Sequence, residues 1–173
     1  MEQPNDFQEE FIQNSCYRMD ESLRMIKKCF GQLTEEQVWI KPNAVTNSIG
    51  NLILHLCGNI TQYGIASLQG IEDRRNRDKE FETKSGYSKE ELLDVLSDTV
   101  NEAKKSFKTS ETSELLKKRS VQGFEFSGIG NIVHVVEHFS YHTGQIALWT
   151  KLLNNKNLGF YDGFDLNLKN ENT

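Results

Sequence analysis

Three of the four histidines in this sequence are spaced so that they share one face of a helix. His134, His138 and His142 recur every four residues within residues 133–153. At about 100° per residue, this spacing places them in one slowly drifting stripe. Most of the remaining circumference is apolar, which is typical of a buried helix. Because an unpaired buried imidazole is costly, the stripe must face a site or find partners inside the protein.

The fourth histidine, His55, lies in a second segment of the same character, residues 48–68. Asn51, Asn59 and Gln62 share its side of the helical wheel, and apolar residues fill much of the rest. Two apolar helices with polar, histidine-bearing seams favour a bundle with a small polar site in its core. Helical bundles usually hold their metals in such a place.

Histidines one helical turn apart reach the same ion, and a third ligand must then come from another helix. His138, His142 and His55 would form a three-nitrogen site with an open coordination position, the pattern of catalytic rather than closed structural zinc. His134 and His142 do not easily share one ion, because about 12 Å of helix separates them. His134 is therefore either a hydrogen-bonding partner of the site or a substitute for His142.

Two other interpretations of the histidines are less favoured. Residues 134–138 fit H-x-x-E-H, the inverted zinc-protease motif, but Glu137 lies about 100° round the helix from His138 and little chain follows. The histidines could instead be core residues satisfied by internal hydrogen bonds. That role is equally open to Gln145 and Asn59, which in a metal site would orient imidazoles or a bound water. Four histidines on two buried seams favour the metal site.

Length and composition predict one soluble domain. A chain of 173 residues can bury a substantial core, and 36% hydrophobic with 26% charged residues is ordinary globular composition. The net charge of -5 disfavours nucleic acid as a partner. Cys16, Cys29 and Cys57 lack metal-ligand spacing and are interpreted as reduced core thiols of a cytoplasmic protein. No uncharged apolar run approaches the ~20 residues of a membrane span.

Apolar periodicity predicts four long helices and no convincing strand. The helices span about residues 6–33, 48–68, 88–108 and 128–153. Ser48 or Asn47 fits the N-cap of the second helix, and Ser88 and Ser127 fit the N-caps of the third and fourth. Residues 121–126 are too short and isolated to predict a sheet. The expected fold is all-α, a single four-helix bundle over residues 1–173, in which residues 158–173 form a docked or partly disordered tail.

The connection between the second and third helices is long and dense in both charge signs. Residues 71–87 read IEDRRNRDKEFETKSGY and show almost no periodicity. A solvated connection is the ordinary interpretation of such a charged run. Its length instead favours a functional segment, because structureless loops beyond ~12 to 15 residues are often functional in compact domains.

The motifs SIGNLILHLCGN and, later in the chain, HxxYHTGQI resemble the DinB/YfiT-like superfamily, named for a DNA-damage-inducible protein. The run RNRDKEF, residues 75–81, further resembles a DinB-like subfamily of unknown function. The resemblance implies a four-helix bundle, commonly a homodimer, that holds a divalent metal, usually zinc or nickel. The ligands it implies are His55, His138 and His142, with His134 outside the ligand set.

The resemblance also implies a reaction of low-molecular-weight thiols, since characterised relatives catalyse mycothiol-dependent isomerisation or bacillithiol S-transfer. The first hypothesis is a metal-dependent thiol S-transferase that acts on a small molecule in detoxification or stress response. Arg74, Arg75 and Arg77 could hold the thiol's carboxylates if the charged loop folds over the site. The alternative is a non-catalytic metal-binding stress-response protein, and a metal-dependent hydrolase is a third hypothesis.

Overall fold

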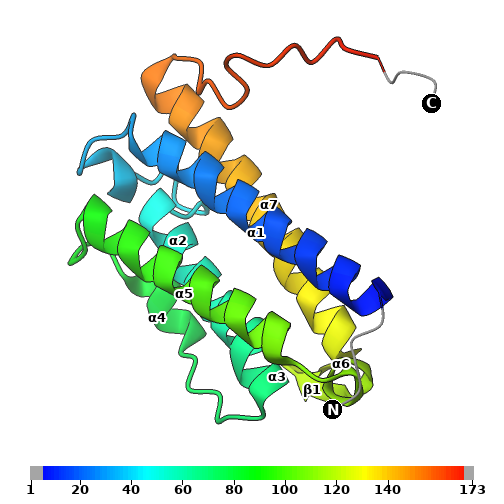
Figure 1. Ribbon diagram of the computed structural model, residues 1–173. Helices are drawn as coiled ribbons and strands as arrows, with labels where there is room; N and C mark the ends of the chain where they lie inside the picture. Colours follow the sequence, from blue (N-terminus) through cyan, green and yellow to red (C-terminus); the bar gives the residue numbers. More distant parts are fainter. Residues whose placement is uncertain (1–5, 170–173) are drawn as a thin grey trace.

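The chain is largely helical in the computed structural model, which describes residues 6–169. Four long helical stretches lie side by side (Figure 1). They are α1 (Asp6–Phe30), the continuous run of α2 (Ile49–Asn59), η2 (Ile60–Ala66) and α3 (Ser67–Gln69), then α5 (Lys89–Thr109) and α7 (Gly128–Asn154). Both α1 and α2 pack against α5 and α7. Among the described residues, no helix is both long and apolar enough to cross a membrane.

Shorter elements fill the connections between these helices. They are η1 (Gln37–Trp39), α4 (Arg77–Glu82), α6 (Thr112–Leu116), β1 (Lys118–Val121) and β2 (Phe124–Ser127). The four predicted helices are present, with ends that differ from the predicted ones by a few residues. Helix ends commonly shift by this amount, because the terminal backbone groups lack partners within the helix.

Serine side chains set the start of three long helices, as the sequence indicated. Ser48, Ser88 and Ser127 each accept a hydrogen bond from the backbone N–H three residues further on. At the first two caps, the side chain of Asn51 or Glu91 bonds back to the serine N–H and completes a capping box. The caps therefore fix where α2 and α7, the two histidine-bearing helices, begin.

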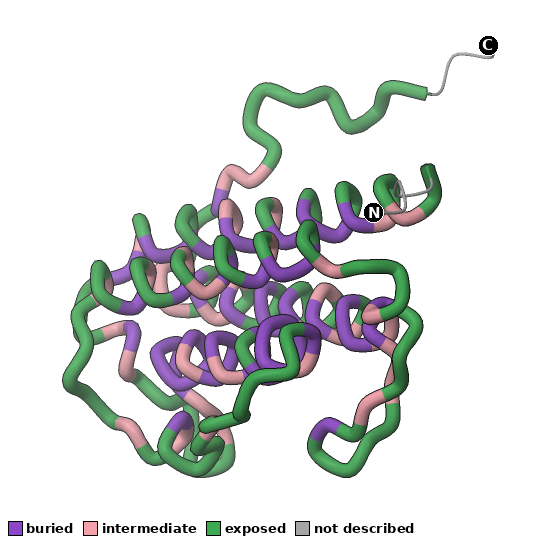
Figure 2. The backbone as a smooth tube through the Cα atoms, turned by 60° about the horizontal axis from the view of Figure 1, so that its bottom comes forward, coloured by how far each residue is buried: buried purple, intermediate pink, exposed green. Residues whose placement is uncertain are grey.

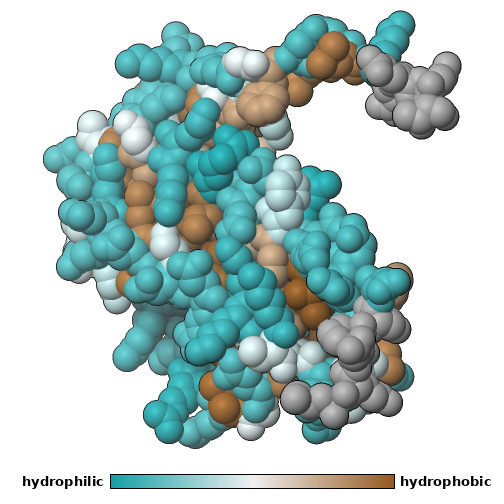
Figure 3. Space-filling model, viewed as in Figure 1, coloured by the Kyte–Doolittle hydropathy of each residue, from teal (hydrophilic) through white to brown (hydrophobic). Residues whose placement is uncertain are grey.

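Apolar side chains fill the space between the long helices. Figure 2 shows buried residues on the sides that these helices turn toward one another. Among the largest fully buried side chains are Phe30, Tyr63, Phe107 and Phe139. Seen from the side of α1 and α5, the surface is mostly hydrophilic, and apolar atoms show mainly in the seams between helices (Figure 3). This packing holds α2 and α7 at a fixed distance from each other.

The prediction that no strand forms was wrong. β1 and β2 pair as an antiparallel hairpin in which Val121 lies opposite Phe124. Gln122 and Gly123 between them have φ values of 52° and 81°, and positive φ at both positions suits the tight turns that hairpins favour. The usual turn signal is Asn-Gly or Asp-Gly, so Gln-Gly gave no warning of the hairpin.

The charged connection after α3 is also more ordered than a solvated loop. The chain leaves α3 at Gly70, whose φ is 65°. Asn76 then caps α4 by accepting a hydrogen bond from the Lys79 backbone N–H. We call residues 72–83 the strap. This segment contains α4 and lies beside α2 (Figure 1).

The C-terminal tail docks in part. Leu158 is buried, and the Arg24 guanidinium of α1 donates a hydrogen bond to the carbonyl of Phe160. Residues 162–169 are exposed. Residues 170–173, which the predicted tail includes, lie outside the described residues.

Candidate metal centre

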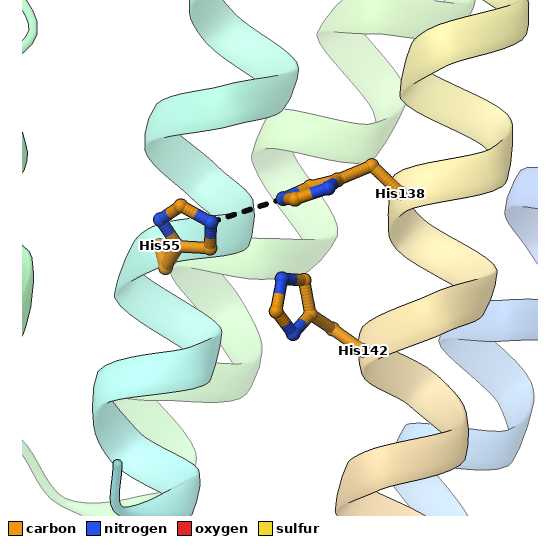
Figure 4. Close-up of side chains that lie close together, drawn as sticks. All are labelled: His55, His138 and His142. Atoms are coloured by element: carbon orange, nitrogen blue, oxygen red, sulfur yellow. Dashed lines mark hydrogen bonds between the residues drawn. The ribbon is translucent and has the colours of Figure 1, made fainter. Parts of the chain in front are cut away.

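Three histidine side chains from two helices converge beneath the strap. His55 comes from α2, and His138 and His142 come from α7 with their rings directed toward it (Figure 4). Ring nitrogens of the three lie within 4.8 Å of one another, and the Nε2 atoms of His55 and His138 are 2.9 Å apart. His55 and His142 are buried and His138 is half-buried. The structure thus brings together the three residues that the sequence proposed as ligands.

The proton position on His55 follows from its contact with Glu80. Glu80 Oε2 lies 2.9 Å from His55 Nδ1. Burial alone would raise the pKa of Glu80, but hydrogen bonds from Arg75 and His55 outweigh it and the pKa is lowered overall. An ionised carboxylate can only accept, so the proton in this contact belongs to Nδ1. In the neutral form of His55, the lone pair is therefore on Nε2, which faces the other two histidines.

Arg75 holds Glu80 from the opposite side. Its Nε donates to Glu80 Oε1 at 2.7 Å and its Nη2 to Oε2 at 2.9 Å, a bidentate charge-assisted pair. Nη2 also lies 3.0 Å from His55 Nδ1. Arg75 Nη2 and His55 Nδ1 both approach Glu80 Oε2, so they are two donors that share one acceptor. The Arg75 side chain is only 4% exposed, so its charge is enclosed within the protein and engaged with Glu80.

Gln145 gives His142 the same proton arrangement. Its Oε1 lies 2.7 Å from His142 Nδ1 and can only accept, so Nδ1 carries the proton and Nε2 the lone pair. Burial lowers the pKa of His142, against the opposing hydrogen bond from Gln145. Burial and then the neighbouring imidazoles lower the pKa of His138 to about 3. These rings are therefore neutral near pH 7, the state that metal ions bind.

His134 has a different role from the other three histidines. Asn59 Nδ2 lies 3.1 Å from His134 Nε2 and donates to it, so that lone pair is already used. The His134 ring packs against Tyr63 at 4.2 Å and stacks on His138 at 5.3 Å between centroids. His134 thus lies beside the cluster, with its ring packed on Tyr63 and His138 and its Nε2 bonded to Asn59.

The donor set fits a divalent cation. The Nε2 atoms of His55 and His138 are 2.9 Å apart, a distance at which either His138 Nε2–H donates to His55 Nε2 or both nitrogens face a cation. Imidazole nitrogens suit zinc, nickel and related ions as ligands. Three protein ligands also leave a coordination position open, as in catalytic zinc sites.

The three arginines considered for substrate binding separate in space. The guanidinium carbon of Arg77 lies 4.9 Å from the centroid of the Phe81 ring. The centroids of the Phe81 and His55 rings are also 4.9 Å apart. Arg77 thus reaches the outer side of the site through Phe81. Arg74 is in an exposed ion pair, whereas the Arg75 side chain is buried and paired with Glu80.

Comparison with known proteins places the chain in a family. Residues 6–161 match the family described as "Protein of unknown function (DUF1572)". The chain belongs to the DUF1572 family. A solved structure titled "Crystal structure of the conserved protein of locus from Enterococcus faecalis" is similar at a TM-score of 0.71 and 16% identity, over 83% of this chain and 97% of that one. At this identity the likeness shows the fold alone, and no curated protein matches the chain.

Glu80, which contacts His55 Nδ1, is a residue of the candidate site that the sequence did not single out. A signal for it is Gly58, three residues after His55 on the same side of α2. A Cβ built at Gly58 would lie 2.0 Å from Glu80 Oε1, so the carboxylate packs where any larger residue would stand. A glycine on the histidine face of an apolar helix can mark such a close approach.

Two residues of this DUF1572 protein are set apart from the cluster, in agreement with their sequence-based exclusion. Glu137, the general base of the H-x-x-E-H interpretation, is exposed and outside the group of converging histidines. Burial raises the pKa of the Cys57 thiol to about 12, which keeps it protonated. Neither Glu137 nor Cys57 lies in the group of converging side chains found among the described residues.

Proposed function

We propose that this DUF1572 protein is a DinB-like four-helix bundle that uses a divalent ion, zinc or nickel, to transfer a low-molecular-weight thiol onto an electrophilic small molecule. The observation that carries the proposal is the convergence of His55, His138 and His142 with Nε2 lone pairs on both helices. An ion held by three imidazoles would keep one position open and lower the pKa of a thiol that occupies it.

The surrounding residues have roles in this scheme. The thiolate sulfur attacks an electrophilic carbon, a C–S bond forms, and the leaving group departs with the electron pair of its broken bond. Arg77, over Phe81 at the side of His55, is placed to attract a carboxylate of the thiol. Tyr141 is exposed and packs on His142 at 5.0 Å, which supports a role for its ring beside the reacting groups.

The setting we propose is the cytoplasm, where small thiols are kept reduced. The three cysteines are free and buried, as suits a reducing compartment. The DinB-like resemblance further supports a homodimer that acts on a small molecule, with neither nucleic acid nor membrane as partner.

A hydrolase is less well supported by the position of the acidic groups. Among the described residues, Glu80 is the carboxylate in contact with the histidine cluster, but it lies behind His55 and is bound to Arg75. A general base must reach a water on the open side of the centre. The non-catalytic metal protein shares the same ligands and differs in having no exchangeable ligand.

The test begins with metal content. We expect untagged protein to contain one divalent ion per chain by elemental mass spectrometry, and His138→Ala to contain none. His134→Ala is the matched control, because it removes a histidine of the same stripe that is not a ligand, and it should keep the ion.

The second part of the test is activity. Metal-loaded protein should transfer bacillithiol, mycothiol or glutathione to monochlorobimane, with the fluorescent product as readout, and His138→Ala should not. A bound ion with no thiol turnover, and with no change in the spectrum of a cobalt-substituted sample on adding thiol, would favour the non-catalytic metal protein.

A further inference from the structure

A polar stripe on the run from α2 into η2 fastens both ends of the strap. Asn51 Nδ2 donates to the backbone carbonyls of Glu80 and Thr83, at 2.9 and 2.6 Å. About three turns further on, Gln62 Nε2 donates to Asp73 Oδ2 at 2.5 Å. The strap is therefore attached along the same side of the helix that carries His55.

Between these attachments the strap buries an ion pair against His55. The side chains of Arg75 and Glu80 are 4% and 9% exposed. Gly58 provides the space, since an added Cβ would lie 2.0 Å from Glu80 Oε1 and 2.8 Å from Arg75 Nε. Arg75 Nη1 also donates to Gln62 Oε1 at 2.8 Å. The Arg75–Glu80 pair is thus held against Gly58, Gln62 and His55, with Glu80 Oε2 aimed at His55 Nδ1.

Stability alone is a weak explanation for this arrangement. Burying two charges carries a desolvation cost that can exceed their attraction, so apolar replacements of such pairs are often as stable or more so. A carboxylate behind a histidine has a specific effect in a metal site. It holds the proton on the far nitrogen, orients the ring and makes the ligating nitrogen more basic.

We propose that Glu80 is a positioning residue of the metal centre, which prepares His55 to bind the ion, and that Arg75 holds Glu80 in place. This inference rests on the proposed metal site and extends it to the strap. Arg75 then acts within the centre instead of binding a substrate carboxylate, which leaves Arg77 for that role. Loss of such a partner typically weakens metal binding by about 10–100-fold.

The experiment measures zinc affinity and the proton position of His55 separately. Zinc is titrated into metal-free protein in competition with a chromophoric chelator, and ¹⁵N-histidine NMR of the metal-free protein reports which ring nitrogen carries the proton. The wild type should show His55 protonated on Nδ1. Glu80→Ala should lose this preference and bind zinc about 10–100-fold more weakly. Glu80→Gln keeps an acceptor without charge and should retain the Nδ1 proton with a smaller loss of affinity.

Two further variants separate this role from folding. Glu72→Gln removes the partner of Arg74 in an exposed ion pair of the same strap and should leave both readouts unchanged. Glu80→Ala leaves the Arg75 charge buried and unpaired, so the double variant Arg75→Met/Glu80→Met removes both charges together. The double variant should fold and show the same loss of zinc affinity as Glu80→Ala.

The outcomes distinguish the inference from the proposed function. Equal zinc affinity in the wild type and in folded Glu80→Ala, with an unchanged His55 proton, would overturn the role of Glu80 alone. Absence of zinc binding in the wild type would reject the metal centre itself.

Discussion

The helical run that begins with α2 carries two stripes of identical spacing. One is apolar, Ile49, Ile53, Leu56 and Ile60, and the other is Asn51, His55, Gly58 and Gln62. The second stripe starts two residues after the first, about 200° round the helix. The apolar stripe is fully buried in the core, and the other meets the strap and α7. One side of the helix thus builds the fold and the opposite side builds the site.

Burial does not distinguish the two stripes, because both are shielded from water. Asn51 is 0% exposed and His55 is 6% exposed. The difference is in their partners: the polar side chains bond to Glu80, Asp73 and neighbouring groups, as buried polar groups must. A change in the apolar stripe should therefore reduce stability, and a change in the polar stripe should reduce metal affinity.

The largest effect is expected from the apolar stripe. Ile53→Ala removes buried methyl and methylene groups from a side chain that is 0% exposed, and the free energy of unfolding should fall by about 2–5 kcal/mol. Urea denaturation of the metal-free protein measures this loss. Zinc affinity of the molecules that remain folded should match the wild type. A loss well below 1 kcal/mol would contradict the assignment of this stripe to the core.

An intermediate effect is expected at Gly58. The methyl group of Gly58→Ala would displace the Glu80 carboxylate, so zinc affinity should fall by about tenfold or more. Stability should change little, because the better helix propensity of alanine, about 0.5–1 kcal/mol, opposes the cost of crowding. Chelator competition and urea denaturation give the two values.

A double variant shows whether the effect of Gly58→Ala passes through Glu80. In a Glu80→Ala background the added methyl group has no carboxylate to displace, and Gly58→Ala should cause no further loss of affinity. Additive losses would mean that Gly58 acts on the site by another route.

The smallest effect is expected on the exposed side of the strap. Arg74→Ala removes a charge whose side chain is 83% exposed and pairs with Glu72 at the surface. Its unfolding free energy should stay within about 0.5 kcal/mol of the wild type, and its zinc affinity should not change. A clear loss of zinc affinity would show that the strap contributes to the site through its overall charge and not through Arg75 and Glu80.

The sequence alone predicted the helices and the converging histidines, for physical reasons. The apolar period of each helix and the serine caps are local signals, and they placed α2 and α7 to within a few residues. Histidines four residues apart necessarily share a helix face, so His138 and His142 could be paired before any contact was known. Pairing them with His55 required only that two polar seams meet in one core.

Glu80 could not be predicted in the same way. Its surroundings in the strap are charged at nearly every position, so composition gives the same signal for buried Arg75 and exposed Arg74. Which of the two arginines is buried depends on contacts with Asn51, Gly58 and other residues that are far away in sequence. The hairpin was missed for a related reason, since its turn has no strong local signal and its pairing is tertiary.

The most direct test of the metal centre is a crystal structure of the untagged, zinc-loaded protein with anomalous diffraction at the zinc edge. We expect one strong peak per chain, about 2.0–2.1 Å from the Nε2 atoms of His55, His138 and His142. No peak in the core, or an ion bound through His134 or through Nδ1 of His55, would contradict this expectation.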